Sequence, residues 1–168
     1  MPDIRDRVKE LRRVPASSLW PSPRNWRMHP KAQTDALRGV LAEIGFADAL
    51  IARETPEGLE LVDGHLRAAE MGDALVPVLV LDLDEEEAGK LLLTLDPLAA
   101  MADANKDSLA MLLESVRFQD GAVNRMMVTL AQNAGITPPD FQPVGIGEQG
   151  RLDEKAKVTC PECGHEFT

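Results

Sequence analysis

The stretch LVDGHLRAAE, residues 61–70, most constrains the fold, because it turns a strand into a helix at one glycine. Residues that favour a strand run into Gly64, and an alanine-rich helical run follows at once. His65 and Arg67 stand directly beside this turn. One interpretation is a helix start and a guanidinium arranged to bind phosphate; the other is a tight turn with an exposed arginine and a packed histidine.

The segments before residue 84 predict short strands mixed with amphipathic helices. Both predicted helices end at a glycine, and the turn TPEG pairs a proline with a glycine, as a hairpin turn does. The last strand is apolar from Val76 to Leu81, as expected of a strand covered on both faces. The predicted elements are a strand over 14–20, a helix over 31–44, a hairpin over 49–63, a helix over 65–71 and a strand over 76–83.

The next segment carries the signals of a helix start. Asp84, with Glu87 three residues on, resembles a capping box, so we expect a helix from there to about Leu95. Asp96 followed by Pro97 predicts the start of a further helix, with Asp96 as its N-cap and proline at the first position.

The rest of the chain divides by composition. Two more amphipathic helices fit residues 107–117 and 122–134, and the following stretch is rich in proline and glycine without an apolar period. The predicted organisation is a basic leader over 1–13, a compact α+β domain over 14–104, a helical extension over 105–135, a linker over 136–157 and a cysteine-containing tail over 158–168.

The net charge of −10 is unevenly distributed. Residues 1–31 carry eight Lys/Arg against three Asp/Glu, a balance of +5, whereas the remaining ten against twenty-five give −15. An acidic body repels nucleic acid, so DNA contact is expected through the basic N-terminal segment. The alternative is a solvated amphipathic leader, because Ile4, Val8 and Leu11 recur at helical spacing.

The apolar runs are all short. None approaches the roughly 18 residues that a transmembrane helix needs. The N-terminal residues MPDIRDRVKELRR have no apolar segment behind them of the kind a signal peptide contains. We therefore expect a cytoplasmic protein with no membrane partner.

The order of elements over roughly residues 12–100 resembles the ParB/sulfiredoxin superfamily. Four segments are similar to the ParB-like proteins of phages and prophages: NWRMHPKAQTDALRGVL, VDGHLR, VPVLVLDLDEEEA and LLLTLDPLAAMAD. Partition proteins of that family have a Gly-Glu-Arg-Arg phosphate loop, which is matched here in its first and last residues by Gly64-His65-Leu66-Arg67. SPRNWR resembles the family's upstream Asn-Pro-x-x-x-Arg loop, and this makes Arg27 the expected second phosphate contact.

The resemblance implies a small mixed sheet packed with helices that binds a nucleoside triphosphate with Mg²⁺. The triphosphate would contact Gly64, His65, Leu66, Arg67 and Arg27. The implied role is a phage or mobile-element DNA transaction, with weak triphosphate hydrolysis as one expectation. Asp63 and His65 are then the candidate catalytic bases.

Alternatives remain open. Free-serine kinases of the superfamily carry a Gly-His-x-Arg loop like this one, so a kinase is one alternative, and a ParB-like nuclease is another. A third is an accessory protein of a DNA methyltransferase or packaging system with a degenerate pocket. Sulfiredoxin chemistry is excluded, because His65 stands where that reaction needs a cysteine.

The chain departs from the family pattern at three places. LTLDPLAAM replaces the Glu-Asn-x-x-Arg motif that completes the nucleotide and magnesium site, so Asp96 is the candidate magnesium ligand. Asp48-Ala49 replaces the Gln/Thr-Pro of the base-reading strand, so cytidine specificity is not implied. The helices after residue 105 do not resemble the helix-turn-helix that reads DNA in partition proteins.

The tail CPECGHEF resembles one knuckle of a zinc ribbon. Zinc prefers four ligands in a tetrahedron, and this segment offers Cys160, Cys163 and His165. A complete site would need water or a second chain as a further ligand, and the second chain would make the protein a homodimer. The alternatives are a vestigial tail or a redox motif, although the latter needs a βαβ context that the sequence lacks. The cysteines indicate a reducing compartment.

Overall fold

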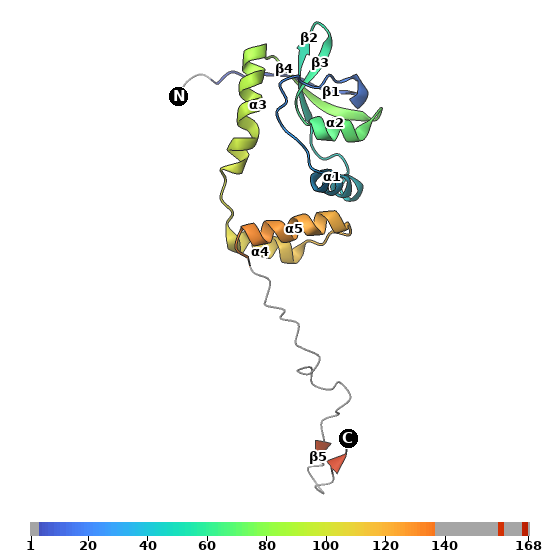
Figure 1. Cartoon of the computed structure of the whole chain (residues 1–168), viewed down its shortest axis with the longest axis vertical. Coiled ribbons are helices and arrows are strands. Elements are labelled where there is room, and N and C mark those ends of the chain that lie inside the picture. Colours follow the sequence, from blue (N-terminus) through green and yellow to red (C-terminus); the bar gives the residue numbers. More distant parts are fainter. Residues whose placement is uncertain (1–3, 137–157, 160–165, 168) are drawn as a thin grey trace. The chain divides into compact units, whose positions relative to one another are not determined.

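A computed structural model describes residues 4–136 and the backbone of the short segments 158–159 and 166–167. Residues up to Ile136 form one compact unit, built on a four-stranded mixed sheet (Figure 1). Its strands are β1 (Val8–Pro15), β2 (Leu50–Thr55), β3 (Gly58–Asp63) and β4 (Leu75–Leu81).

The sheet has the order β1-β4-β2-β3. β4 pairs antiparallel with β1 and parallel with β2, while β2 and β3 form the antiparallel hairpin predicted around TPEG. β4 therefore lies inside the sheet. Val76, Val78 and Val80 on one face of β4 are completely buried. Pro77 and Leu81 on the other face are buried as well, which confirms the strand covered on both faces.

The helices are η1 (Ala16–Ser18), α1 (Lys31–Glu43), α2 (His65–Met71), α3 (Glu85–Ala100), α4 (Lys106–Ser115) and α5 (Gly121–Asn133). α1 and α2 have the predicted limits within a residue or two. α1 is followed by Gly45 and α2 by Gly72, both at positive φ, as expected for glycine stops. The predicted α+β class is confirmed.

Two apolar cores lie on opposite faces of the sheet. The larger one joins the inward residues of the strands to Ala68 of α2 and Leu19. The smaller one joins Val62 of β3 to Ala88 and Leu92 of α3. Each face is thus covered by a helix, and the turn at Gly64 carries the chain from the sheet into the helix that covers the larger core.

The N-terminal segment is a strand and not a helix. β1 spans Val8–Pro15, so the helical alternative for the leader is wrong. The strand predicted over 14–20 is wrong beyond Pro15, because Ala16–Ser18 form the 3-10 helix η1. β1 crosses the boundary expected at residue 13. It is an edge strand whose charged side chains face water, and such charges protect an exposed edge from pairing with other chains.

α3 is longer than the sequence predicts. The capping box of Asp84 and Glu87 is present, but the helix continues through Pro97 to Ala100. Asp96 is therefore an interior helical residue, and its interpretation as an N-cap is wrong. Pro97 has no N–H to donate to the carbonyl of Leu93, so α3 loses one hydrogen bond at this point.

The two last helices of this unit match their predicted ranges closely. α5 packs on α1, where Val123 is fully buried. The approach is close: a Cβ built on Gly39 would lie 2.7 Å from the side chain of Val123. The predicted helical extension therefore packs against the domain predicted over 14–104.

The candidate zinc ligands Cys160, Cys163 and His165 lie outside the described residues. Two short paired strands, β5 (Val158–Thr159) and β6 (Glu166–Phe167), flank them. Among the helices that the structure describes, none is long and apolar enough to cross a membrane.

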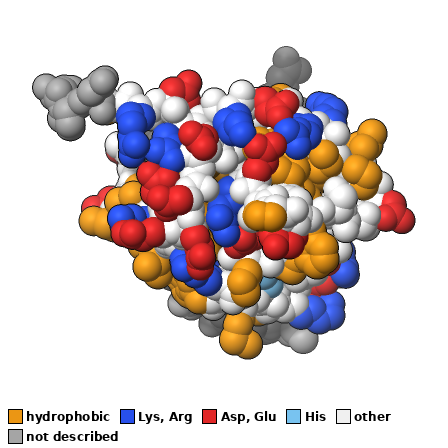
Figure 2. Space-filling view, turned by 90° about the horizontal axis from the view of Figure 1, so that it is seen from above, with side chains coloured by type: hydrophobic (Ala, Val, Ile, Leu, Met, Phe, Trp, Pro, Cys, Tyr) orange, Lys and Arg blue, Asp and Glu red, His pale blue; other side chains and the backbone are white. Residues whose placement is uncertain are grey.

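The charges of the N-terminal segment are paired with the acidic body. Glu87 of α3 pairs with Arg5 and Arg7, and Glu54 of β2 pairs with Lys9 and Arg12. Figure 2 accordingly shows basic and acidic side chains interspersed on the face viewed. Most of the basic excess predicted to meet DNA is neutralised within the folded chain.

Candidate functional site

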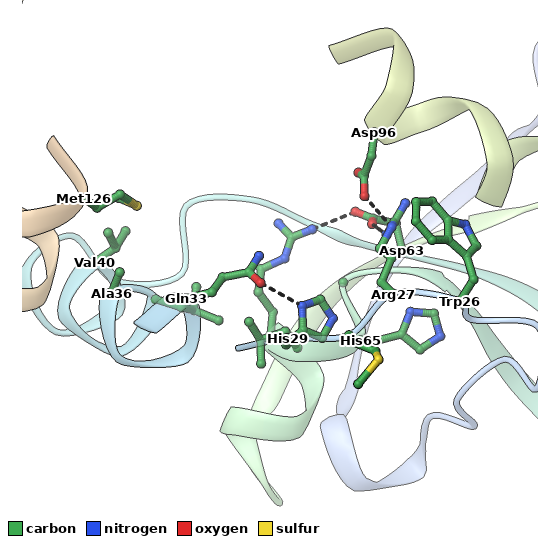
Figure 3. A pocket seen from close by; sticks show the side chains of 15 residues that line it. Trp26, Arg27, His29, Gln33, Ala36, Val40, Asp63, His65, Asp96 and Met126 are labelled. Carbon is green, nitrogen blue, oxygen red and sulfur yellow. Dashed lines mark hydrogen bonds and ion pairs between the residues drawn. The ribbon is translucent and has the colours of Figure 1, made fainter. Parts of the chain in front are cut away.

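A cavity of about 640 Å³ opens beside the turn at Gly64 (Figure 3). It has a polar end near Trp26 and an apolar end between α1 and α5. Every site residue predicted for residues 4–136 contributes to its lining: Arg27, Asp63, Gly64, His65, Leu66, Arg67 and Asp96. The apolar end includes Ala36, Leu37, Val40 and Met126.

Gly64 is required by the turn itself. Its φ of 89° lies in the left-handed region that favours glycine. A Cβ at this position would also lie 2.3 Å from Cδ2 of the buried Leu50. The tight-turn interpretation therefore explains the glycine without any ligand. α2 has only seven residues, so the case for anion binding depends on the side chains around the turn.

Arg67 points back over the turn. Its Nη2 donates to Oδ2 of Asp63 at 2.9 Å, and its Nη1 donates to Asp48. The Arg67 side chain is 20% exposed, so it is largely buried. The tight-turn interpretation, which expected an exposed arginine here, is wrong on this point. Burial alone would raise the pKa of Asp48, but hydrogen bonds from Arg67 and the Ala49 N–H lower it below its usual value.

Arg27 reaches the same carboxylate from the opposite side. Its Nη1 donates to Oδ1 of Asp63 at 2.8 Å, and its Nε forms an ion pair with Asp96. The guanidinium lies over the ring of Trp26, 6.0 Å from the centroid, and the Trp26 N–H donates to the Leu92 carbonyl at 3.3 Å. The two arginines predicted from separate segments therefore converge on one site.

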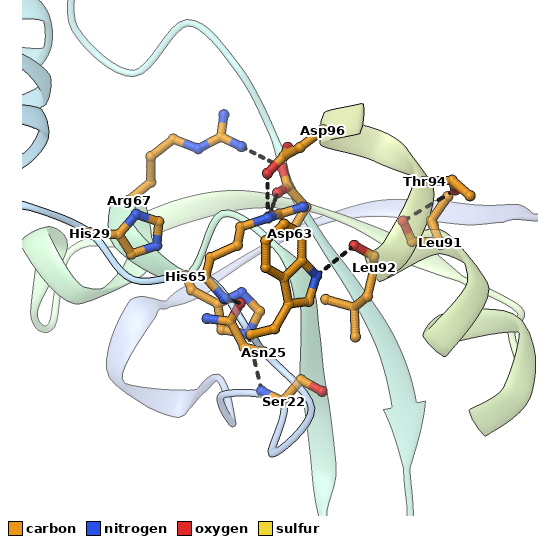
Figure 4. A network of polar contacts seen from close by, with 12 residues as sticks. Ser22, Asn25, His29, Asp63, His65, Arg67, Leu91, Leu92, Thr94 and Asp96 are labelled. Carbon is orange, nitrogen blue, oxygen red and sulfur yellow. Dashed lines mark hydrogen bonds and ion pairs between the residues drawn. The ribbon is translucent and has the colours of Figure 1, made fainter. Parts of the chain in front are cut away.

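These ion pairs form a continuous chain, Asp48–Arg67–Asp63–Arg27–Asp96. Figure 4 shows three of its members, Arg67, Asp63 and Asp96. It links the segment before β2 to the C-terminal half of α3. Three carboxylates face two guanidinium groups, so the cluster carries one excess negative charge. The position of Asp63, four residues before Arg67, signals this pairing in the sequence; the contribution of Asp48 has no such local signal.

His65 is the first residue of α2 and is half-buried. Its Nε2 accepts a hydrogen bond of 3.1 Å from the backbone N–H of Ser22. Burial, and then the positive charge of Arg27, lower the pKa of His65 below its usual 6.5. Sequence reasoning missed Ser22, because the contact uses only its backbone.

The site contains no preformed metal centre. Among the described residues there is no group of three or more His, Cys, Asp or Glu placed to hold a metal ion. Asp96, the predicted magnesium ligand, is instead paired with Arg27. A metal ion brought in with a ligand would therefore compete with this arginine for the carboxylate.

Comparisons with known proteins show the fold. No family model matches the sequence, and the search of curated proteins gives no match. A solved structure of the C-terminally truncated chromosome-partitioning protein ParB from Caulobacter crescentus, complexed with CTP-γ-S, is 22% identical with a TM-score of 0.51, covering 76% of this chain and 72% of that one. The same protein complexed to the centromeric parS site is 20% identical with a TM-score of 0.44, covering 77% and 73%.

The chain is thus an α+β protein with a mixed sheet and a polar cavity at a strand-to-helix turn. More specifically, it has a ParB-like fold. The aligned share of the chain is larger than residues 14–104, the extent expected for the domain.

Proposed function

We propose that the chain binds a nucleoside triphosphate in the cavity beside Gly64, with its phosphates held by Arg27 and Arg67. The observation that carries this proposal is the convergence of these two arginines, from segments far apart in the sequence, at one end of a cavity. A guanidinium matches phosphate oxygens in geometry and charge. The solved ParB with this fold was crystallised with a CTP analogue, which supports the choice of ligand.

The charge of the site favours a nucleotide that carries a metal ion. With one excess negative charge, the cluster opposes a free triphosphate, and Mg²⁺ on the phosphates reduces that repulsion. Magnesium in nucleotide sites keeps several waters and takes one or two carboxylates together with phosphate oxygens. Asp96 is the more exposed of the two carboxylates that pair with Arg27, and we propose it as the ligand of the magnesium ion.

The experiment is calorimetry of the full chain with ATP, CTP, GTP and inorganic tripolyphosphate, each with and without Mg²⁺. A hydrogen bond to a charged group contributes about 1.5–3 kcal/mol, so Arg67→Ala should lose roughly 10- to 150-fold in affinity. Arg38→Ala is the matched control, because Arg38 also pairs with carboxylates but lies outside the cavity lining. If the unmodified chain binds none of these ligands at millimolar concentration, the proposal is wrong.

Turnover has less support than binding. Asp63 accepts hydrogen bonds from both arginines, and the Nε2 lone pair of His65 is taken by Ser22. Neither candidate base is free to accept a proton in this arrangement. A nuclease would need carboxylates gathered around metal ions, whereas Asp48, Asp63 and Asp96 are separated by the arginines that they pair with.

A second candidate function is that of an accessory protein. α4 and α5 expose large apolar side chains, a feature of protein-binding surfaces; these are Met111, Leu112, Met126, Val128 and Leu130. The resemblance to phage and prophage proteins suggests a DNA methyltransferase or packaging partner in a DNA transaction. A neighbouring methyltransferase or terminase gene would favour this role, and a partition ATPase gene would favour segregation.

Zinc binding by Cys160, Cys163 and His165, with closure of the site in a homodimer, stays a proposal. It rests on the knuckle pattern of the sequence alone. Metal analysis of the purified full chain, together with its oligomeric state, is the test.

A further inference from the structure

The strand-to-helix turn contains a side chain whose two ring nitrogens have different environments. His65 Nε2 lies 3.1 Å from the backbone nitrogen of Ser22, which donates its hydrogen to it. His65 Nδ1 is buried and has no hydrogen-bond partner among the described residues. Figure 3 shows the ring and Arg27 together at the polar end of the cavity.

The contact with Ser22 fixes the tautomer of this ring. A nitrogen that accepts a hydrogen bond cannot itself carry hydrogen, so Nε2 is unprotonated. A neutral imidazole then carries its hydrogen on Nδ1. Nδ1 is therefore a buried N–H donor without an acceptor. Such a donor is unfavourable unless a ligand or water accepts its hydrogen bond.

A second unpaired donor belongs to Arg27 in the same cavity. Its Nη2 is buried without a partner, and its Nε lies near Asp96 without the direction that a hydrogen bond needs. Arg27 and His65 both line the polar end. The site thus has unpaired N–H groups from two side chains. These groups complement a ligand with several acceptor atoms, such as a phosphate group.

Protonation of His65 would break its hydrogen bond with Ser22. An imidazolium carries hydrogen on both nitrogens, so Nε2–H would face the N–H of Ser22 and this contact would be lost. The nearby positive charge of Arg27 acts in the same direction. The geometry therefore keeps the ring neutral and leaves Nδ1–H as its one hydrogen-bonding group for a ligand.

We propose that His65 is a neutral hydrogen-bond donor to an acceptor oxygen of the bound phosphate, through Nδ1, and is not a general base. The same ring positions the loop that carries Arg27, because Nε2 holds that loop at Ser22. One side chain thereby connects ligand contact with the placement of the second arginine. The identity of the ligand rests on the proposed function. The tautomer of His65 does not, because it follows from the contact with Ser22.

The first measurement is nitrogen NMR of the histidine side chains in the full chain. The sequence has three histidines, so His29→Gln and His65→Gln assign the spectrum. We expect Nδ1 of His65 to carry hydrogen and Nε2 to be unprotonated, with the Nδ1 hydrogen signal shifting when inorganic tripolyphosphate is added. The opposite tautomer, or an imidazolium near neutral pH, would overturn the inference.

The second measurement compares two substitutions that each keep one half of the ring's function. Gln places a carbonyl oxygen near the position of Nε2, and Asn places an N–H donor near that of Nδ1. His65→Gln should weaken tripolyphosphate binding roughly tenfold or more with little change in melting temperature. His65→Asn should lose less affinity and more thermal stability.

The outcomes separate this inference from the proposed function. If the unmodified chain binds tripolyphosphate and His65→Gln binds equally well, the donor role of His65 is wrong and the proposed function stands. If the unmodified chain binds neither tripolyphosphate nor nucleotides, the proposed function is wrong, and with it the ligand of His65.

Discussion

Several residues at the polar end of the cavity have more than one contact, and substitutions of these residues must be interpreted accordingly. Asp63 accepts from both arginines, at 2.8 and 2.9 Å. Its removal would leave two poorly solvated guanidinium groups with fewer partners, and such a loss destabilises a fold strongly. Asp96 is the better probe, because it has a single partner and its side chain is 54% exposed.

Asp96→Asn distinguishes two roles of Asp96: competing with the phosphate for Arg27, and binding the magnesium ion. Without Mg²⁺, the substitution frees Arg27 and removes one negative charge, so tripolyphosphate should bind about fivefold more tightly, corresponding to about 1 kcal/mol for a partly exposed pair. With Mg²⁺, the affinity should fall if Asp96 is a metal ligand. Calorimetry with and without Mg²⁺ distinguishes the two. Asp35→Asn, which removes a carboxylate paired outside the cavity lining, is the control.

His65 gives the stability of the fold a defined dependence on pH. Because its pKa is lowered in the folded state, the unfolded chain binds more protons as the pH falls below 6.5. The free energy of unfolding should therefore be greatest above that value and decrease with falling pH until the folded pKa is passed. The charged or titratable groups that act on this ring are Arg27, Asp63, His29 and Glu60.

Urea unfolding between about pH 8 and pH 5 measures this dependence. His65→Gln should remove the part due to His65 and leave the part due to the carboxylates. An identical pH profile in the two chains would show that the buried ring does not contribute.

At the scale of elements, the strand-to-helix turn depends on glycine for packing as well as for backbone conformation. Gly45 and Gly64 have nearly the same φ, 88° and 89°. A Cβ on Gly45 would meet nothing within 4 Å, whereas one on Gly64 would meet Leu50 at 2.3 Å. The two positions therefore form a matched pair: their φ angles agree, and they differ in the room available for a side chain.

Alanine at Gly45 should cost about 1–2 kcal/mol for its left-handed backbone. Alanine at Gly64 should cost about 1–3 kcal/mol more, because Leu50 has to move. Denaturant unfolding of both variants measures the difference. Equal costs would mean that Leu50 rearranges freely. Substitution of Gly64 therefore reports on the fold and is no test of phosphate binding.

Local signals explain which elements could be predicted from the sequence. The hairpin, the glycine stops and the Asp84–Glu87 box each lie within a few residues of the structure that they specify. The strand β1 could not be identified this way, because its partner β4 lies far along the chain and its edge position leaves it without apolar alternation. Pro97 misled the prediction of α3, since proline is favoured at the first position of a helix and disfavoured in its interior.

The same distinction applies to the candidate site. Arg27 and Arg67 were found because they match a family pattern, and the structure brings them together on Asp63. The roles of Asp48 and Ser22 depend on tertiary contacts, and no residue pattern indicates them. The ion pairs that neutralise the N-terminal basic residues are likewise invisible in a count of charges.

For the whole molecule, the distribution of paired charges predicts weak DNA binding. The isolated chain should bind duplex DNA without sequence preference, at about 10⁻⁵ M or poorer near physiological salt. Fluorescence anisotropy with unrelated duplexes measures this. Sub-micromolar, sequence-selective binding would contradict it. Deletion of residues 1–13 is not a suitable variant, because it removes most of β1.

The position of β4 inside the sheet also determines when the chain can fold during its synthesis. β1 leaves the ribosome first, yet Val8 pairs with Leu81, and β2 pairs in parallel with the same late strand. Until β4 has emerged, only the β2–β3 hairpin has both of its strands, and an isolated hairpin is marginally stable. A nascent chain therefore gains its sheet in one late step, and during that wait the charged residues of β1 keep it from pairing with neighbouring chains.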